Sequence, residues 1–284
     1  MFRVWRLPLV PLLVARERRA RPGRPRVPEP MVMDDPQAAA EYDEAGAIVQ
    51  LPVHDLNARA ISALLPPGGT VVDLGCASGR LLARLAKGRP DARLIGLDLS
   101  DAMLEHGRRL MEREGVADRV ELRRGDITTF DTDLAETPDV VSCSFTLHQL
   151  PEPELVERCL AAIARIRERT GCAVYLFDLV RLRHPRTWPD HVKVVRFPGP
   201  VFEADTIASE AAAYTFEELT AMCEAAGLRD LRRLRARPLG EYQVHLAPGQ
   251  RPVAPGRWQP VPVPAAARLA TAATRSGFPR SLTG

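Results

Sequence analysis

The 284-residue sequence contains no apolar run that approaches the ~20 residues of a membrane-spanning helix, which argues against an integral membrane protein. Lysine occurs only at Lys87 and Lys193, and the formal net charge is only +3. Such a modest charge gives little support to a nucleic-acid-binding surface. None of the five cysteines has C-x-x-C spacing, and most lie in apolar runs. We therefore expect reduced core cysteines, a cytoplasmic location and no metal site.

The two ends of the chain lack the apolar patterning of a folded domain. Residues 1–33 have a short apolar stretch broken by Pro8 and Pro11, followed by an Arg/Pro run without a patterned apolar face. We expect this segment to be disordered, or an over-extended start before Met31 or Met33, and its deletion to leave the fold intact. Residues 248–284 are rich in Pro, Arg and Ala, and we expect a tail that is largely disordered or draped on the surface, with at most a short helix.

The central region, residues 34–247, has the patterning of one α/β domain, consistent with a sequence that is 45% hydrophobic. Leading helices are expected in 34–66. Short apolar runs then alternate with amphipathic stretches, which is typical of a Rossmann-like, doubly wound sheet with helices on both faces. The runs expected to form strands are 70–75, 94–98, 119–124, 139–144, 172–178, 228–238 and 240–248.

The turn after the first of these strands is rich in small residues. The sequence TVVDLGCASGR places Gly75, Ala77 and Gly79 at alternate positions, directly after the acid Asp73. Small residues let a ligand approach the backbone, and glycine tolerates a positive φ. The pattern does not fit the G-x-G-x-x-G loop that binds a pyrophosphate, and Asp73 would repel phosphate. An acid here suits an ammonium group.

Asp98 ends the second strand, where an acid can accept both hydroxyls of a ribose. The loop therefore calls for a ligand with an ammonium group and a ribose but no phosphate between them, as in S-adenosyl-L-methionine. At this point the chain resembles the class I S-adenosylmethionine-dependent methyltransferases, whose glycine motif is matched by Asp73-x-Gly75-x-Ala77-x-Gly79. Ala77 stands where glycine is usual.

The resemblance implies a seven-stranded sheet of order 3-2-1-4-5-7-6 with the last strand antiparallel. It also implies that Asp126, after the third strand, binds the adenine amino group, with Ile127 as an apolar wall. S-adenosyl-L-homocysteine would be the product. The full set of expected cofactor contacts is Asp73, Gly75, Cys76, Ala77, Gly79, Asp98, Leu99, Met103, Asp126, Ile127 and Ser144.

Candidate catalytic residues lie beyond the fourth and fifth strands. His148 follows the fourth strand and could accept a proton, although a histidine that starts a helix is more often structural. Asp178 ends the fifth strand, where it could orient a substrate, take a proton or cap the next turn. Residues 179–214 form a long, lid-like connection rich in cationic and aromatic side chains. The candidate substrate contacts are Tyr42, Gln149, Arg183 and His184.

We expect methyl transfer to an oxygen or nitrogen atom of a small-molecule metabolite, either anionic or planar. The fourth strand is not followed by an (Asn/Asp)-Pro-Pro-aromatic sequence or by a Pro-Cys pair, which carry amine and cytosine methylation in related enzymes. RNA or protein methylation, or a non-catalytic S-adenosylmethionine-binding module, are the alternatives. The acceptor and the oligomeric state stay open.

Overall fold

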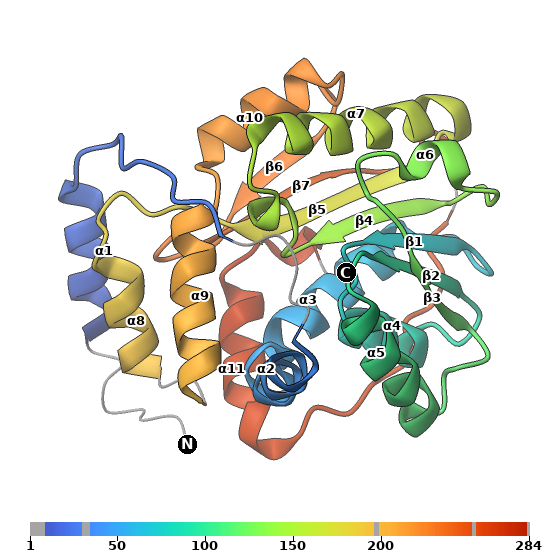
Figure 1. Ribbon diagram of the computed structural model, residues 1–284, viewed down its shortest axis with the longest axis horizontal. Coiled ribbons are helices and arrows are strands. Elements are labelled where there is room, and N and C mark those ends of the chain that lie inside the picture. Colours follow the sequence, from blue (N-terminus) through green and yellow to red (C-terminus); the bar gives the residue numbers. More distant parts are fainter. Residues whose placement is uncertain (1–8, 30–34, 196–198, 252–253, 283–284) are drawn as a thin grey trace.

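A computed structural model describes residues 9–29, 35–195, 199–251 and 254–282. Its centre is a seven-stranded sheet of order β3-β2-β1-β4-β5-β7-β6 (Figure 1). The strands are β1 (Thr70–Leu74), β2 (Arg93–Asp98), β3 (Val120–Arg124), β4 (Val140–Ser144), β5 (Ala173–Leu179), β6 (Arg232–Arg235) and β7 (Tyr242–Ala247). Strands β1 to β5 pair in parallel, and β7 runs antiparallel to β5 and β6. The predicted fold class and strand order are confirmed.

Helices cover both faces of this sheet. They are α1 (Val10–Arg19), α2 (Pro36–Val49), α3 (Leu51–Leu64), α4 (Arg80–Gly88), α5 (Asp101–Glu114), α6 (Phe130–Asp133), α7 (Pro153–Thr170), α8 (Thr187–Val195), α9 (Pro200–Ala212), α10 (Phe216–Ala225) and α11 (Ala265–Ser276), with 3₁₀ turns η2 (Leu147–Gln149) and η3 (Arg280–Leu282). A capping box is present at α10, where Thr215 and Glu218 bond each other's backbone N–H groups. None of the described helices is both long and apolar enough to cross a membrane.

Alternate residues of each strand enter two different cores, because successive side chains of a strand point to opposite faces. Val71 of β1 packs with helices α3, α4 and α5 on one face. Its neighbour Val72 packs with α6, α7 and α10 on the other (Figure 1). Both faces of the parallel strands are therefore buried, and their carboxyl ends meet at one edge. Polar groups at that edge come from Asp73, Asp98 and Asp178.

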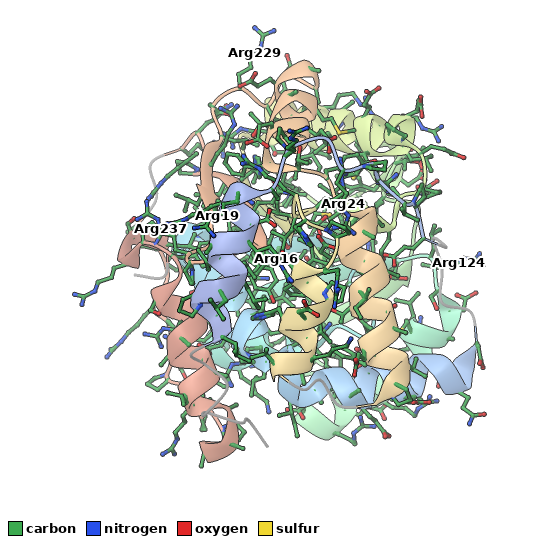
Figure 2. The ribbon with its side chains drawn as sticks, turned by 90° about the vertical axis from the view of Figure 1, so that its left-hand side faces the viewer. Arg16, Arg19, Arg24, Arg124, Arg229 and Arg237 are labelled. Carbon is green, nitrogen blue, oxygen red and sulfur yellow. The ribbon has the colours of Figure 1, made fainter. Side chains whose placement is uncertain are left out.

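The N-terminal segment was expected to be disordered, but residues 9–29 are ordered. The rest of that segment, residues 1–8 and 30–33, lies outside the described residues. Pro11 does not break a helix but occupies the first turn of α1, where the missing N–H is not needed. Leu13 is buried, and the buried carboxylate of Glu17 accepts the backbone N–H groups of Arg183 and His184 at 2.6 and 3.1 Å. Helix α1 lies beside α8 (Figures 1 and 2).

The tail is also ordered where the structure describes it. Trp258 packs against the core on the side of α3 and α4, and a Cβ atom at Gly88 would lie 2.2 Å from its ring. Phe278 is buried in the same core, and α11 packs on α3. The expected short helix and draped path are present, whereas the expectation of disorder is wrong for residues 254–282. Proline-rich sequence has here become ordered because its few large apolar side chains find partners.

The lid-like connection, residues 179–214, is mainly helical. Helices α8 and α9 lie side by side near the carboxyl edge of the sheet (Figure 1), with Trp188 and Phe202 buried. The ring of Trp188 stacks on His191 at 5.2 Å between centroids, and that of Phe202 lies 5.2 Å from Tyr42 of α2. The leading helices and this connection therefore meet above the site.

Candidate active site

The first position of the glycine loop can hold only a residue without a side chain. Gly75 has φ +69°, and a Cβ atom there would lie 2.2 Å from the side chain of Thr146. The N–H groups of Gly75 and Cys76 both donate to the carbonyl of Leu97, at 2.8 and 3.0 Å. Ala77 has φ +48°, which is unfavourable for a residue with a Cβ atom. The loop therefore carries local strain at the position where the family pattern has glycine.

Two buried carboxylates flank this loop. Asp73 accepts a hydrogen bond from Oγ of Ser142 at 2.6 Å, and its burial raises its pKa to about 7. Asp98 accepts the N–H groups of Ala77 and Ser100 at 2.8 and 2.9 Å, and burial raises its pKa above the ordinary value. A carboxylate offers about four lone-pair sites, so both groups can accept further donors from a ligand. A bound cation would favour the charged form of Asp73.

A cavity of about 350 Å³ opens at this edge of the sheet. Of the predicted cofactor and substrate contacts, those that line it are Tyr42, Asp73, Gly75, Cys76, Ala77, Asp98, Leu99, Met103, Ser144 and Gln149. Three predicted cofactor contacts do not line it. Gly79 instead begins α4, and Ile127 is buried in the core beside α6 and α7. Asp126 is exposed and accepts the N–H of Thr128 at 2.8 Å, next to Gly125, whose N–H bonds the carbonyl of Asp98.

Helix α2 is attached to the glycine loop through a residue that the sequence did not reveal. The carboxylate of Asp43 pairs with Arg80, accepts a hydrogen bond from Ser78 and lies 2.9 Å from Nε2 of His106. Burial opposes its charge, but the bonds from Arg80 and Ser78 outweigh burial and lower its pKa. No spacing rule links Asp43 to a loop 35 positions further along the chain.

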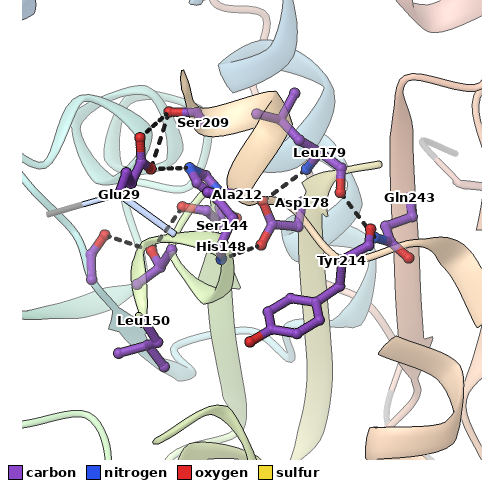
Figure 3. Close-up of polar contacts among 12 residues, drawn as sticks. Glu29, Ser144, His148, Leu150, Asp178, Leu179, Ser209, Ala212, Tyr214 and Gln243 are labelled. Carbon is purple, nitrogen blue, oxygen red and sulfur yellow. Dashed lines mark hydrogen bonds and ion pairs between the residues drawn. The ribbon is translucent and has the colours of Figure 1, made fainter. Parts of the chain in front are cut away.

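The structure brings His148 and Asp178 together. Nδ1 of His148 lies 2.5 Å from Oδ1 of Asp178, and the backbone N–H of His148 donates to Oδ2 at 3.1 Å. Both side chains are buried. Burial disfavours the charged imidazole, but the adjacent Asp178 carboxylate more than compensates and raises the pKa of His148. Figure 3 shows His148 between Asp178 on one side and Glu29 on the other.

Glu29 and Asp205 are site residues that the sequence analysis missed. Oε1 of Glu29 lies 3.5 Å from Nε2 of His148, and Ser209 of α9 donates to the Glu29 carboxylate at 3.2 Å. Burial raises the pKa of Glu29 to about 7 and that of Asp205 to about 6. Glu29 belongs to a segment that resembled a disordered leader, and Asp205 to a weakly patterned helix. Neither offered a recognisable signal.

A second cavity, of about 270 Å³, adjoins the first. The walls that the two share are formed by Tyr42, Gln50, Phe145 and Asp205. His148 lines the second cavity, so it faces the junction. Arg183 and His184 line neither, because Glu17 binds their backbone on the far side of the connection. Among the described residues, no group of three or more His, Cys, Asp or Glu side chains is placed to hold a metal ion.

Comparison with known proteins finds relatives of the region around the first cavity. The sequence model of the methyltransferase-domain family matches residues 71–171. The carboxy-S-adenosyl-L-methionine synthase of Wolinella succinogenes is 40% identical over 96 residues, which cover 33% of this chain and 38% of that protein. The ubiquinone biosynthesis O-methyltransferase of Hahella chejuensis is 33% identical over 119 residues, covering 40% of this chain and 47% of that protein. The chain thus spans less than half the length of these two curated relatives.

A solved structure extends the likeness to most of the fold. The crystal structure of an S-adenosylmethionine-dependent methyltransferase from Aquifex aeolicus superposes with a TM-score of 0.52 at 20% identity. The match covers 75% of this chain and 98% of that protein. At this identity the likeness establishes the fold alone.

Proposed function

We propose that this chain, which carries a class I S-adenosylmethionine-dependent methyltransferase domain, transfers a methyl group to an oxygen or nitrogen atom of a small molecule. The observation that carries the proposal is the pair of adjoining cavities, with His148 facing their junction. In-line transfer requires donor and acceptor to meet end to end, which two cavities with one shared wall allow.

The first cavity fits S-adenosyl-L-methionine and its product S-adenosyl-L-homocysteine. Asp73 and Asp98 both have lone pairs left to accept donors, the former from an ammonium group and the latter from ribose hydroxyls. Two carboxylates at the loop would repel the pyrophosphate of a dinucleotide. In this proposal the residues that pack around the same pocket are Asp126, Ile127 and Gly79. Asp126 would lie toward the adenine.

The chain's contribution to catalysis is mainly positional. S-adenosylmethionine supplies an activated methyl group on a positively charged sulfur. The walls of the second cavity hold the acceptor atom in line, a contribution worth up to ~7–11 kcal/mol of barrier. His148, oriented by Asp178, removes the acceptor's proton, which adds typically ~10²–10⁴-fold in rate. Proton removal requires the Nε2 atom of His148 to face the junction of the two cavities.

Calorimetry and a transfer assay test this function. S-adenosylhomocysteine should bind, and NAD should not. Replacement of Asp98 by Ala should weaken S-adenosylhomocysteine binding by about 10- to 100-fold, because a buried group loses a charged partner. Asp101→Asn is the matched control, because Asp101 is exposed and pairs only with Arg124 at the surface. Tighter binding of NAD than of S-adenosylhomocysteine would contradict the proposal.

A further inference from the structure

The walls of the second cavity are rich in aromatic side chains. Aromatic residues make up only 5% of the sequence, yet six of them line this one cavity. They are Tyr42, Phe145, Trp188, Phe202, Tyr242 and Phe278. Phe145 and Tyr242 meet edge to face, with ring centroids 6.0 Å apart. Such walls bind a ring or another apolar body, and their π-faces also attract a cation.

The acidic groups near His148 come from both cavities. Glu29 lines the first cavity, Asp205 lines both, and Asp178 pairs with the His148 ring behind the cavity wall. Glu241 also lines the second cavity, and its Oε2 atom is buried without a hydrogen-bond partner in the described part of the chain. Burial lowers the pKa of the lining His191 to about 4, so its ring is neutral. An anionic acceptor would therefore meet like charge at the reacting end.

The carboxylate of Asp205 interacts with His148 through charge alone. It lies on the wall shared by both cavities and makes no hydrogen bond or ion pair with the described residues. Glu210, on the same helix, instead pairs with Arg24 at 2.8 Å. A half-buried carboxylate with no partner is costly unless a ligand provides one. Arg237, the one arginine among the lining residues, is exposed at the surface near α11 (Figure 2).

We propose that the methyl acceptor is an amine carried on an aromatic or other apolar ring, with its nitrogen held against Glu29 and Asp205. This deepens the proposed function and rests on it. The ring packs against the aromatic walls of the second cavity, and the ammonium form pairs with the two carboxylates. An acceptor bearing a carboxylate or phosphate, as the arginine-rich connection suggested, is disfavoured because Arg183 lines neither cavity.

The proton and electron balance of the step is simple. The bound ammonium first gives one proton to Glu29 or to Nε2 of His148, which leaves a nitrogen lone pair. Burial raises the pKa of Glu29 to about 7, so a carboxylate at this position can hold a proton near neutral pH. The lone pair forms the N–C bond while the C–S bond breaks and its electron pair returns to sulfur. The methylated nitrogen is again cationic, and the same carboxylates stabilise that charge.

A matched series of one-ring ligands tests the charge preference. Phenethylamine, 2-phenylethanol and 3-phenylpropionate differ mainly in the charge at the end of one side chain. Binding of each is measured by calorimetry at pH 7.5 with the protein saturated in S-adenosylhomocysteine. We expect phenethylamine to bind at least 10-fold more tightly than 3-phenylpropionate, with the alcohol between them. N-Methylphenethylamine should form when S-adenosylmethionine replaces the product, as seen by mass spectrometry.

Variants assign the preference to the two carboxylates. The double variant Glu29→Gln, Asp205→Asn should lose at least 10-fold in phenethylamine affinity, and an unchanged far-UV circular dichroism spectrum verifies its folding. Glu203→Gln, on the same helix as Asp205 but outside both cavities, should change neither. Equal or tighter binding of the acid, an unchanged double variant, or no binding of the amine would each overturn the inference. Failure to bind S-adenosylhomocysteine at all would instead overturn the proposed function.

Discussion

Asp178 holds His148 at two points, through ring Nδ1 at 2.5 Å and through the backbone N–H at 3.1 Å. When the imidazole is neutral, the ring contact favours a proton on Nδ1, which donates to the carboxylate and leaves Nε2 as an acceptor. The backbone contact fixes where η2 begins relative to the end of β5. A strand-end acid therefore sets both the tautomer and the position of the residue that faces the cavity junction (Figure 3).

The first prediction separates these roles by kinetics. His148→Ala should lower kcat about 10²-fold or more, because the proton acceptor is lost. Asp178→Asn should also lower kcat, since an amide can donate to Nδ1 and favour the wrong tautomer. Both variants should keep S-adenosylhomocysteine affinity by calorimetry, and Asp118→Asn, an exposed carboxylate, is the control. An unchanged kcat in His148→Ala would mean that positioning alone drives the reaction.

The sequence predicted this pair's two members separately, and it did so for a physical reason. Carboxyl ends of parallel strands converge at one edge of a sheet, so Asp73, Asp98, His148 and Asp178 had to lie near one another. Their pairing could not be read, because it depends on the turn of η2. Glu29 lay beyond prediction for a different reason.

Residues outside the sheet were the ones missed. Asp43, Asp205 and Glu29 belong to segments whose position is set by tertiary contacts, not by a strand order. Proline and arginine in the leader suggested disorder, yet Arg16, Arg24 and Arg26 bind carbonyl and carboxylate groups of the folded domain. Composition alone could not distinguish an ordered charged segment that packs on the domain from a disordered charged tail.

The second prediction concerns the part of that segment that we call the strap, residues 21–29. Arg26 donates to four backbone carbonyls, those of Ala212, Pro151, His148 and Leu150, at 2.5 to 2.9 Å. Deletion of residues 1–29 should therefore lower Tm by several degrees and reduce turnover, contrary to the expectation from sequence. Arg26→Ala should reproduce much of the loss, because buried carbonyls are left without partners.

Differential scanning calorimetry and the transfer assay measure this loss. Arg21→Ala is the matched control, since Arg21 is exposed and makes none of the carbonyl contacts that Arg26 makes. A truncated protein with the Tm and turnover of the full chain would show that the strap adds nothing to the site.

The third prediction uses the strained loop residue. Ala77 adopts φ +48°, where a Cβ atom costs roughly 1–2 kcal/mol. Ala77→Gly should stabilise the fold by about 0.5–1 kcal/mol, the relief of strain being offset in part by greater freedom of the unfolded chain. Urea denaturation gives the change, and Ala83→Gly, inside α4, should instead destabilise. Lower stability of Ala77→Gly would show that the methyl group of Ala77 packs usefully.

The last prediction is the pH dependence of stability. Burial raises the pKa of Glu29 from 4.5 to about 7, so the folded protein binds a proton between these values that the unfolded chain releases. The stabilisation from that proton is complete below pH 4.5 and is lost as the pH rises through 7. The groups that face Glu29 are His148, Asp205, Ser209 and Asp178. Its carboxylate favours the charged form of His148, so removing it also lowers the pKa of His148.

From pH 5 to pH 8 the free energy of unfolding should fall less in Glu29→Gln than in the unmodified protein. The two decreases should differ by roughly 1–3 kcal/mol. Chemical denaturation at the two pH values measures the difference, and Glu44→Gln, an exposed substitution on α2, should follow the unmodified protein. Buried acids that do not face Glu29 titrate alike in both proteins and cancel in the comparison. Equal losses in Glu29→Gln and the unmodified protein would mean that Glu29 is already ionised at pH 5. It would then be paired with a charged His148 throughout this range, and the imidazole, not the glutamate, would hold the proton at the cavity junction.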